Sequence, residues 1–509
     1  MSKTLLSYEV PRTLSVQQLV AELALWVLVR LGEQWQGSRT FFDTFDWRLY
    51  QANMVLEFDQ SATASRLCLQ NLAHVQVLMQ TEIAAVPRFA SEFASEDFRK
   101  QLGQLIAMRA LLPVASLPFQ STVVHILNTD EKTVLRVYLE EYDALPTRML
   151  LQIVKGYDQE VMSTIKMLQQ HFTLQPQNQT VFQQALQQHG TQPGAYSSKF
   201  SLKFEPEIPA EQALTQIFQC LLHTLQVNEA GCIANIDSEF LHDYRVAIRR
   251  TRVALGQLQR VFPAEVLLEF RLFFAWLGQI TSSIRDVDVY LLQFDQYLQL
   301  FAPERRADLE PLRALLQHKQ QVAYQELAAH LHSAYYQTNL QQWALFLANT
   351  RQQALGTRAH WPVQRMADFY IWKMFQRVSK AARLIDGDSS AQDLHELRKD
   401  MKKLRYLLEF FHSLYPKSEL KQVLKMLKSW QECLGTLQDY EVQTQAFIAF
   451  RHEMRSNGTP QATLLALGLL IQDLARQKTI MRQGLVAQLQ TFRERKTQRR
   501  FKALFAANT

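Results

Sequence analysis

The sequence contains few of the residues that break regular structure or cross-link chains. Its 509 residues include 15 glycines, 15 prolines and four cysteines. This scarcity of helix breakers predicts long helices. The cysteines, Cys68, Cys220, Cys232 and Cys433, form no CxxC pair. The sequence therefore indicates neither a disulfide framework nor a zinc knuckle, and a reducing compartment fits best.

Long hydrophobic runs are also missing. The most apolar stretch, 19–32, is too short to span a bilayer and contains Glu22 and Arg30, so it predicts a packed amphipathic helix. The first residues lack the apolar core of a signal peptide. With 47% apolar residues, the chain can bury the cores of roughly two to four domains. We expect a soluble, cytoplasmic protein without a membrane segment.

Charge is distributed unevenly along the chain. Residues 1–198 contain 15 Lys and Arg against 18 Asp and Glu, whereas residues 199–509 contain 40 against 30. The C-terminal part therefore carries a net positive charge that would attract an anionic partner.

A change of pattern predicts a domain boundary near this change of charge. Up to about residue 173, strand-like runs such as TVLRVYLEEY alternate with helical ones, which indicates an α+β domain. The segment 174–204 is rich in glutamine and has almost no charge, so we expect a linker with one short helix. Helical periodicity then predicts an all-α domain over 205–495, followed by a basic tail, 496–509.

A pattern of basic residues occurs twice in the helical part. LHDYRVAIRRTR at 241–252 returns as LHELRKDMKKLR at 394–405. Five basic positions keep their order, each shifted by 153 residues: His242, Arg245, Arg249, Arg250 and Arg252 become His395, Arg398, Lys402, Lys403 and Arg405. Asp286 and Asp439 are also 153 residues apart, and we expect them to hold the repeated arginines or a helix end. Two matches at one offset indicate an internal duplication.

The duplication divides the helical domain into two repeats, about 205–355 and 356–495, which we expect to pack about an approximate twofold axis. At about 100° per residue, positions 0, +3, +7 and +10 of the pattern share one face of a helix. In the second repeat they are His395, Arg398, Lys402 and Arg405, with Lys403 at the edge. A single basic stripe is usually a solvated helix face. Two stripes of one sign and one spacing favour a binding surface, where two cationic ridges meet across a groove.

Further basic residues are placed where they could extend this surface. One set, spaced at 0, +4, +7 and +10, falls on one side of a helix. It comprises Lys373, Arg377, Lys380 and Arg383, and Lys425 and Lys428 follow it. The tail from Phe492 has six basic residues to one acid, and a frayed, solvated end explains it as well as a binding role does.

These stretches, with IRDVDVYL and LGTLQDYEV behind them, resemble the two repeats of the CHAD domain, the conserved-histidine α-helical domain. The resemblance extends from about Glu205 to near Arg495. That family consists of two helical bundles with a basic central channel and binds inorganic polyphosphate. The resemblance implies that the ten repeated basic residues are polyphosphate ligands, and we add the neighbouring cations Lys373, Arg377, Lys425 and Lys428 to the predicted site.

Polyphosphate suits this pattern because it is a chain of charges without bases. Arginine can bind phosphate oxygens with two parallel hydrogen bonds, and lysine adds point charges. Nucleic acid is the natural competitor, but its sites usually include exposed aromatic residues, and the ridges offer chiefly Tyr244 and Tyr406. We therefore expect polyphosphate as the partner, no specific nucleic acid, and binding that weakens with salt.

The N-terminal part resembles a second family. TFFDTFDWRLYQANMVLEF is similar to the strand-and-turn signature of CYTH domains, which form triphosphate tunnels and often precede CHAD domains. The resemblance implies an antiparallel β tunnel or barrel over 1–173. The metal-binding carboxylates of that family are mostly missing, since SYEVP keeps only Glu9 and MLLQIVKG has Leu151, Gln152 and Ile153 at the acidic positions.

The basic residues of such a tunnel are also scarce, since VLEFDQ offers Glu57 and Asp59 where arginines are expected. We expect no metal, no cofactor and no catalysis from this domain, which we interpret as a degenerate scaffold that packs on the CHAD domain or docks a protein partner. The leading hypothesis is a non-enzymatic polyphosphate-binding protein that associates with polyphosphate granules. The alternative is a metal-dependent inorganic triphosphatase whose CHAD part feeds or regulates the CYTH site.

Overall fold

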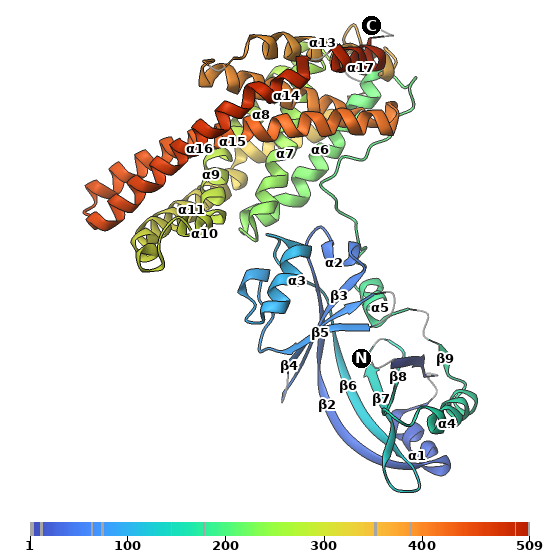
Figure 1. Ribbon diagram of the computed structural model, residues 1–509. Helices are drawn as coiled ribbons and strands as arrows, with labels where there is room; N and C mark the ends of the chain where they lie inside the picture. The colour runs from blue at the N-terminus through green and yellow to red at the C-terminus, as the bar shows by residue number, and fades with distance from the viewer. Residues whose placement is uncertain are drawn as a thin grey trace. The chain divides into compact units, whose positions relative to one another are not determined.

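The protein consists of a β-rich unit followed by a helical unit (Figure 1). The computed structural model describes residues 5–10, 14–62, 65–72, 76–143, 145–176, 179–350, 354–386, 388–493 and 495–506. The two compact units are Met1–Ser198 and Lys199–Thr509. The predicted fold class, an α+β domain followed by an all-α domain, is confirmed.

The N-terminal unit is built on a curled, nine-stranded antiparallel sheet with the order β5-β4-β3-β2-β6-β7-β8-β1-β9 (Figure 1). Its strands are β1 (Leu5–Glu9), β2 (Leu28–Asp43), β3 (Met54–Ser61), β4 (Ser65–Asn71), β5 (Gln76–Glu82), β6 (Leu112–Leu127), β7 (Thr133–Tyr142), β8 (Arg148–Ile153) and β9 (Gln175–Pro176). The long strands β2 and β6 pair along most of their lengths. This is the antiparallel sheet expected of a CYTH-like domain.

The helix predicted over 19–32 is only partly correct. Helix α1 (Val16–Trp26) begins at a capping box on Ser15 and ends at Trp26. From Leu28 the chain continues as β2, because residues 28–31 pair with β6. The apolar run therefore contains a helix end and a strand start, which composition alone does not separate.

Short helices cover the sheet and close its cores. They are α2 (Arg48–Gln51), α3 (Glu96–Ile106), α4 (Asp158–His171) and α5 (Val181–Gln188). Helix α5 lies within the predicted linker 174–204, but Val181, Phe182, Ala185 and Leu186 are buried against the sheet. The predicted short helix is present, and the structure places it in the N-terminal unit, which extends to Ser198.

The C-terminal unit is helical throughout (Figure 1). The first repeat contains α6 (Ala210–Ile233), α7 (Ser238–Gln257), α8 (Ala264–Ile280), α9 (Ser282–Leu292), α10 (Phe294–Leu298), α11 (Glu310–His332) and α12 (Ala334–Ala348). The second contains α13 (Val363–Leu384), α14 (Ala391–Phe410), α15 (Lys417–Ser456), α16 (Gln461–Arg493) and α17 (Arg495–Phe505). In the described ranges, no helix combines the length and apolar content needed to cross a bilayer.

The helix starts confirm the duplication. Helices α6, α7 and α8 begin 153 residues before α13, α14 and α15. The connection between the repeats is also reciprocal: the N–H of Ala210 donates to the carbonyl of Trp361 at 2.9 Å, and the N–H of Val363 donates to the carbonyl of Ile208 at 2.9 Å. Ala210 and Val363 are 153 residues apart, and so are Ile208 and Trp361, so the two hydrogen bonds are equivalent in the two repeats. Such reciprocity is the mark of a twofold relation.

The predicted basic tail, 496–509, is largely a packed helix. The buried rings of Phe501 and Phe505 anchor α17, since Phe501 stacks on Phe375 at 3.8 Å and Phe505 meets Tyr415 at 4.8 Å between ring centroids. The frayed-end interpretation is therefore wrong for the described part of the tail, where the helix packs through these two rings.

Candidate functional site

The two cationic ridges lie on α7 and α14, the equivalent helices of the two repeats. Both helices begin at side-chain caps: Asp237 accepts hydrogen bonds from the N–H groups of Glu239 and Phe240, and Ser390 accepts one from Asp393. These caps fix the first turn of each helix. The apolar face of each helix is buried, which determines the direction of the basic face.

The ridges meet at equivalent positions. Arg249 and Lys402, which the duplication relates, are close enough for their charges to repel each other. Burial, followed by the charges of Arg398, Arg249 and Arg405, lowers the pKa of Lys402 to about 7. Burial and the charge of Arg249 likewise lower the pKa of Arg245 to about 10. Direct interaction between related residues places this point near the pseudo-twofold axis.

We use the name cationic cluster for the basic side chains that interact here: Arg245, Arg249, Arg285, Arg398, Lys402 and Arg405. Five guanidinium nitrogens of the cluster are buried and have no hydrogen-bond partner among the described residues: Nε of Arg245, Arg249, Arg398 and Arg405, and Nη1 of Arg285. Of these, Nε of Arg405 lies near a carboxylate, 3.2 Å from Glu409. Leaving such a donor unsatisfied costs roughly 1–3 kcal/mol. Oxygen atoms of a bound anion would satisfy these donors.

Arg285 was not predicted as a ligand. The residue 153 positions later is Gln438, so Arg285 is absent from the repeated pattern that identified the other cations. The sequence feature that could have indicated it is its position directly before Asp286 in IRDVDVYL.

Two aspartates border the cluster as a second equivalent pair. Arg398 donates from Nη2 to Oδ1 of Asp439 at 3.3 Å, as expected. Arg245 instead donates to the hydroxyl of Thr281 at 2.9 Å, and Asp286 acts on Arg245 through its charge. The two repeats therefore share the arrangement of charges but not every hydrogen bond.

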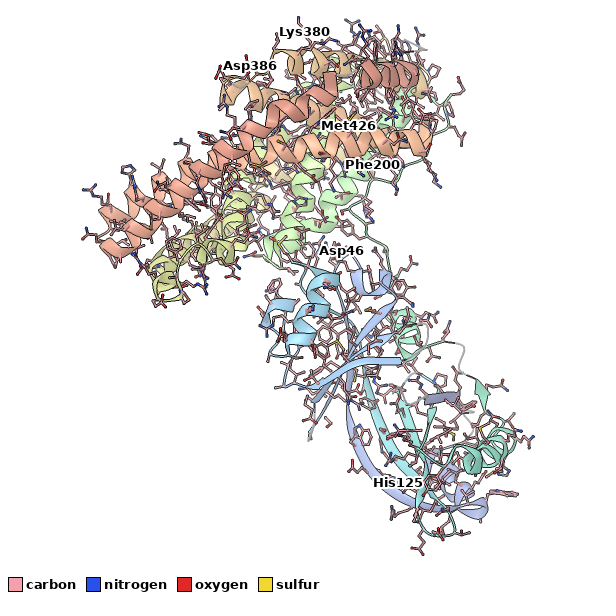
Figure 2. All side chains as sticks on the ribbon, in the orientation of Figure 1. Asp46, His125, Phe200, Lys380, Asp386 and Met426 are labelled. Atoms are coloured by element: carbon pink, nitrogen blue, oxygen red, sulfur yellow. The ribbon has the colours of Figure 1, made fainter. Side chains whose placement is uncertain are left out.

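Glu409 neutralises one edge of the cluster and connects the repeats. It forms ion pairs with Arg250 of the first repeat at 2.7 Å and with Arg405 of the second at 3.2 Å. Arg250 also lies over the rings of Phe200 and Tyr406; Phe200 marks this region in Figure 2. Arg250 thus stabilises the contact between the two repeats, in addition to any contribution to ligand binding.

Asp400 neutralises another edge. The buried carboxylate of Asp400 pairs with Lys403 at 2.8 Å and with Arg377 of α13 at 2.6 Å. These two predicted ligands therefore already have a counter-charge. They connect α14 with the basic side of α13.

The other predicted ligands lie outside the buried part of the cluster. Arg252, Lys373, Lys425 and Lys428 are exposed, with Lys428 3.7 Å from Glu432. His242 and His395 are half-buried, and Nδ1 of His395 lies 3.1 Å from Oε1 of Gln438. Tyr244 and Tyr406, which could have stacked on bases, are both buried.

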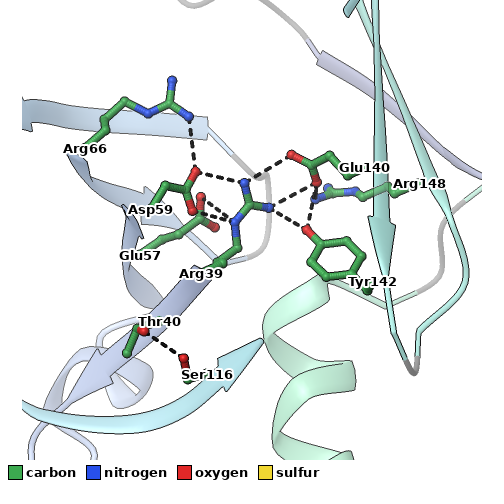
Figure 3. Close-up of polar contacts among 9 residues, drawn as sticks. All are labelled: Arg39, Thr40, Glu57, Asp59, Arg66, Ser116, Glu140, Tyr142 and Arg148. Carbon is green, nitrogen blue, oxygen red and sulfur yellow. Dashed lines mark hydrogen bonds and ion pairs between the residues drawn. The ribbon is translucent and has the colours of Figure 1, made fainter. Parts of the chain in front are cut away.

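The N-terminal unit contains a separate group of charges inside its curled sheet (Figure 3). Arg39 is only 4% exposed. Its guanidinium donates to Oδ1 of Asp59 at 2.7 Å and to Oε2 of Glu140 at 3.0 Å. It also donates to the Tyr142 hydroxyl at 2.7 Å, and its Nε lies 3.4 Å from Oε1 of Glu57. One arginine thus occupies the space among three carboxylates.

Two more arginines balance this network. Arg66 lies 3.3 Å from Asp59, and Arg148 lies 3.8 Å from Glu140. The sequence suggested that few basic residues remain here, and strand register explains the error. Arg39 faces Asp59 across β2 and β3, Asp59 faces Arg66 across β3 and β4, and Glu140 faces Arg148 across β7 and β8. Opposite charges meet across strands, but a single sequence does not show which residues pair.

The pKa values of two carboxyls in this network shift in opposite directions. Burial raises the pKa of Glu57, with further contributions from Asp59 and Glu140 that Arg39 does not offset. Burial also opposes the charge on Glu140, but Arg39 and Arg148 outweigh it and lower the pKa of that carboxyl. Glu140 is therefore the charge that holds Arg39, and Glu57 is the less favourable one.

These residues do not fit a divalent metal ion. The carboxylates bind arginine, and the described part of the chain contains no group of three or more His, Cys, Asp or Glu side chains that could hold a metal. Glu9, the carboxylate kept from the CYTH pattern, accepts a hydrogen bond from Gln184 of α5 at 3.0 Å. Gln152, at an expected acidic position, accepts one from Tyr138 at 3.1 Å.

Comparison with known proteins agrees with this organisation. Residues 216–448 match the family model of the CHAD domain. The chain carries a CHAD domain. The CHAD domain of the plant Ricinus communis is 25% identical, with 57% of this chain and 96% of that chain covered and a TM-score of 0.48. PptA from Streptomyces chartreusis is 15% identical, with coverages of 56% and 100% and a TM-score of 0.44.

The N-terminal half is similar to CYTH-like structures. One is a putative adenylyl cyclase from Hippeastrum, described as having a dominant triphosphatase activity. It is 14% identical, with 39% of this chain and 100% of that chain covered and a TM-score of 0.29. The chain has no match among curated proteins. The CHAD domain supports a polyphosphate-related role.

Proposed function

We propose that the protein binds inorganic polyphosphate through the cationic cluster and does not hydrolyse it. The observation that carries this proposal is the meeting of the two related ridges, where the half-buried Lys402 lies among guanidinium groups with buried nitrogens, without enough acid to neutralise them. Burying like charges is costly unless a counter-charge is present. A bound polyanion would supply that counter-charge.

The chemistry of the cluster favours an inorganic polymer over nucleic acid. Its guanidinium groups offer paired donors for phosphate oxygens. Nonspecific binding of single-stranded nucleic acid usually adds base stacking on exposed aromatic residues. The two tyrosines of the ridges, Tyr244 and Tyr406, are buried and cannot provide it.

The N-terminal network supports a role without hydrolysis. Metal-assisted phosphoryl transfer needs carboxylates that are free to hold the metal and cations that are free to hold the phosphates. Here Asp59 already pairs with Arg39 and Arg66, and Glu140 already pairs with Arg39 and Arg148. The unit would then act as a scaffold, and its exposed apolar residues Leu25, Trp26 and Leu28 would suit a protein partner. Association with polyphosphate granules in the cytoplasm follows as part of the proposal.

A binding titration and a hydrolysis assay test the proposal together. The titration compares long-chain polyphosphate, tripolyphosphate and single-stranded DNA at two salt concentrations, and we expect the long polymer to bind most tightly and its affinity to fall with salt. The hydrolysis assay follows phosphate release from tripolyphosphate with magnesium or manganese. Steady release that Glu9→Gln abolishes would favour the triphosphatase alternative, and preferential binding of DNA would contradict the proposed ligand.

A further inference from the structure

A second basic surface lies outside the cationic cluster, on α13 and α17. These helices pack antiparallel, since Phe375 stacks on Phe501 and, one turn along α13 and one turn back along α17, Gln498 donates to Ser379 at 3.2 Å. The contact buries one side of each helix. The exposed cations on their other sides, here called the α13–α17 face, are Lys373, Lys380, Arg383, Arg499 and Lys502.

The α13–α17 face differs from an ordinary solvated helix surface. Many other exposed or half-exposed cations of this unit have acidic partners, as in Arg305–Asp308, Lys319–Glu453 and Arg476–Asp473. Within the ranges that the structure describes, no side chain of the α13–α17 face forms an ion pair or a hydrogen bond. Lys380 extends outward in Figure 2. The carboxylate of Asp386, after α13, is hydrogen-bonded within its own turn to Ser389.

The face borders the candidate site. Arg377, beside Lys373 and Lys380 on α13, shares the carboxylate of Asp400 with Lys403 of α14. Lys403 is itself next to Lys402 of the cluster. Positive charge therefore continues from the ridge of α14 across its exposed side to α13 and α17.

We infer that the α13–α17 face is a second contact for polyphosphate, which holds the part of a long chain that extends beyond the cationic cluster. The inference rests on the proposed function. Lys373 and Arg383 are separated by about 15 Å along α13, so only a chain that leaves the cluster reaches both. Two linked contacts on one polymer raise affinity through effective concentration. A short anion gains nothing from the second contact.

The test is a charge-matched comparison in the full-length protein. One variant carries Lys380→Gln, Arg383→Gln, Arg499→Gln and Lys502→Gln. The control carries Arg305→Gln, Arg313→Gln, Lys319→Gln and Arg476→Gln, which remove the same charge from ion-paired surface positions. Affinities for long-chain polyphosphate and tripolyphosphate are measured by titration, and thermal unfolding checks that both variants are folded.

We expect the first variant to bind long-chain polyphosphate about tenfold to a hundredfold more weakly than the wild-type protein, with a smaller salt dependence. Its affinity for tripolyphosphate should be unchanged. The control keeps both affinities. Equal losses for the long and short anions, or a long-chain affinity no lower than that of the control, overturn the inference. Single-stranded DNA and vesicles of anionic lipid are titrated in parallel, and a loss of affinity confined to either of them also overturns the inference. If the wild-type protein binds no polyphosphate, the proposed function itself has failed, which is a distinct result.

Discussion

Lys402 provides the sharpest test of the electrostatics of the cationic cluster. Burial and three arginines lower its pKa from 10.5 to about 7. A bound polyanion would replace that repulsion with attraction and raise the pKa again. Polyphosphate binding near neutral pH should therefore take up a proton at this side chain.

The magnitude follows from the two pKa values. At pH 7 about half of the free protein carries a neutral Lys402, so binding should take up about half a proton from this residue. Between pH 8 and pH 6 the protonated fraction rises about tenfold, and the affinity should rise by a similar factor. In the free protein, the charged lysine destabilises the fold by up to about 5 kcal/mol below pH 7. Because the folded pKa is depressed, this destabilisation disappears as the pH rises towards 10.5.

Calorimetric titration in two buffers of different ionisation enthalpy measures the proton uptake. The test variant is Lys402→Met, which keeps most of the volume and removes the charge. We expect it to lose the proton uptake, to bind polyphosphate more weakly, and to unfold at a higher temperature when free, most clearly at pH 6. Both histidines of the ridges remain, so the difference from wild type isolates the lysine.

Lys403→Met is the matched control, since Lys403 is adjacent but pairs with Asp400 at 2.8 Å. It should retain the proton uptake of the wild-type protein. Equal proton uptake by the wild-type protein and Lys402→Met would refute the reasoning. So would an equal loss of stability in both free proteins when the pH is lowered from 9 to 6.

Two further predictions concern the N-terminal unit. Glu57→Gln should raise the stability of the protein at neutral pH, because it removes a buried carboxyl with a raised pKa, and the gain should vanish in acid, where Glu57 is protonated. Glu140→Gln should lower stability by about 3–5 kcal/mol, because buried Arg39 loses one of its two hydrogen-bonded carboxylates and Arg148 loses its own. Since the pKa of Glu140 is depressed, its contribution is present at neutral pH and lost as the pH falls below about 4.5. Urea unfolding at pH 4 and pH 7.5 measures the stability of both variants. Similar effects of Glu57→Gln and Glu140→Gln on stability would contradict the opposite roles assigned to these two carboxyls. In polyphosphate titrations of isolated pieces, residues 199–509 should keep nearly all the affinity and residues 1–198 should bind little, whereas comparable affinity of the N-terminal piece would show that its arginines remain available.

The helical unit could be predicted well because its signals are local and repeated. The offset of 153 residues aligned the basic positions, and the structure shows the same offset in the helix starts and in the reciprocal bonds of Ala210 and Val363. Helical spacing also placed Arg398 and Lys402 on one face. The burial of Lys402 could not be predicted, because it depends on the approach of α7 from the other repeat.

The N-terminal unit was harder to predict because its chemistry depends on strand register. Arg39 and Glu140 are 101 residues apart in the chain and meet only in the folded sheet. Likewise, the apolar run at Leu28 becomes a strand because β6 pairs with it. In the tail, burial of Phe501 and Phe505 makes the segment pack against the helical unit, although its basic composition suggested a solvated end.

The central claim is that two related ridges hold one polyanion, and paired substitutions test it most directly. Titration of long-chain polyphosphate at low salt should show that Arg245→Ala with Arg249→Ala weakens binding by about a hundredfold or more, and that Arg398→Ala with Lys402→Ala weakens it by a similar factor, because each pair removes two charged contacts. Combining all four changes should cost less than the sum, since a chain released from one ridge has already lost the local concentration at the other. Each variant should be at least as stable as the wild-type protein when free. If one pair leaves the affinity unchanged while the other abolishes binding, the ridges do not act together and the account is wrong.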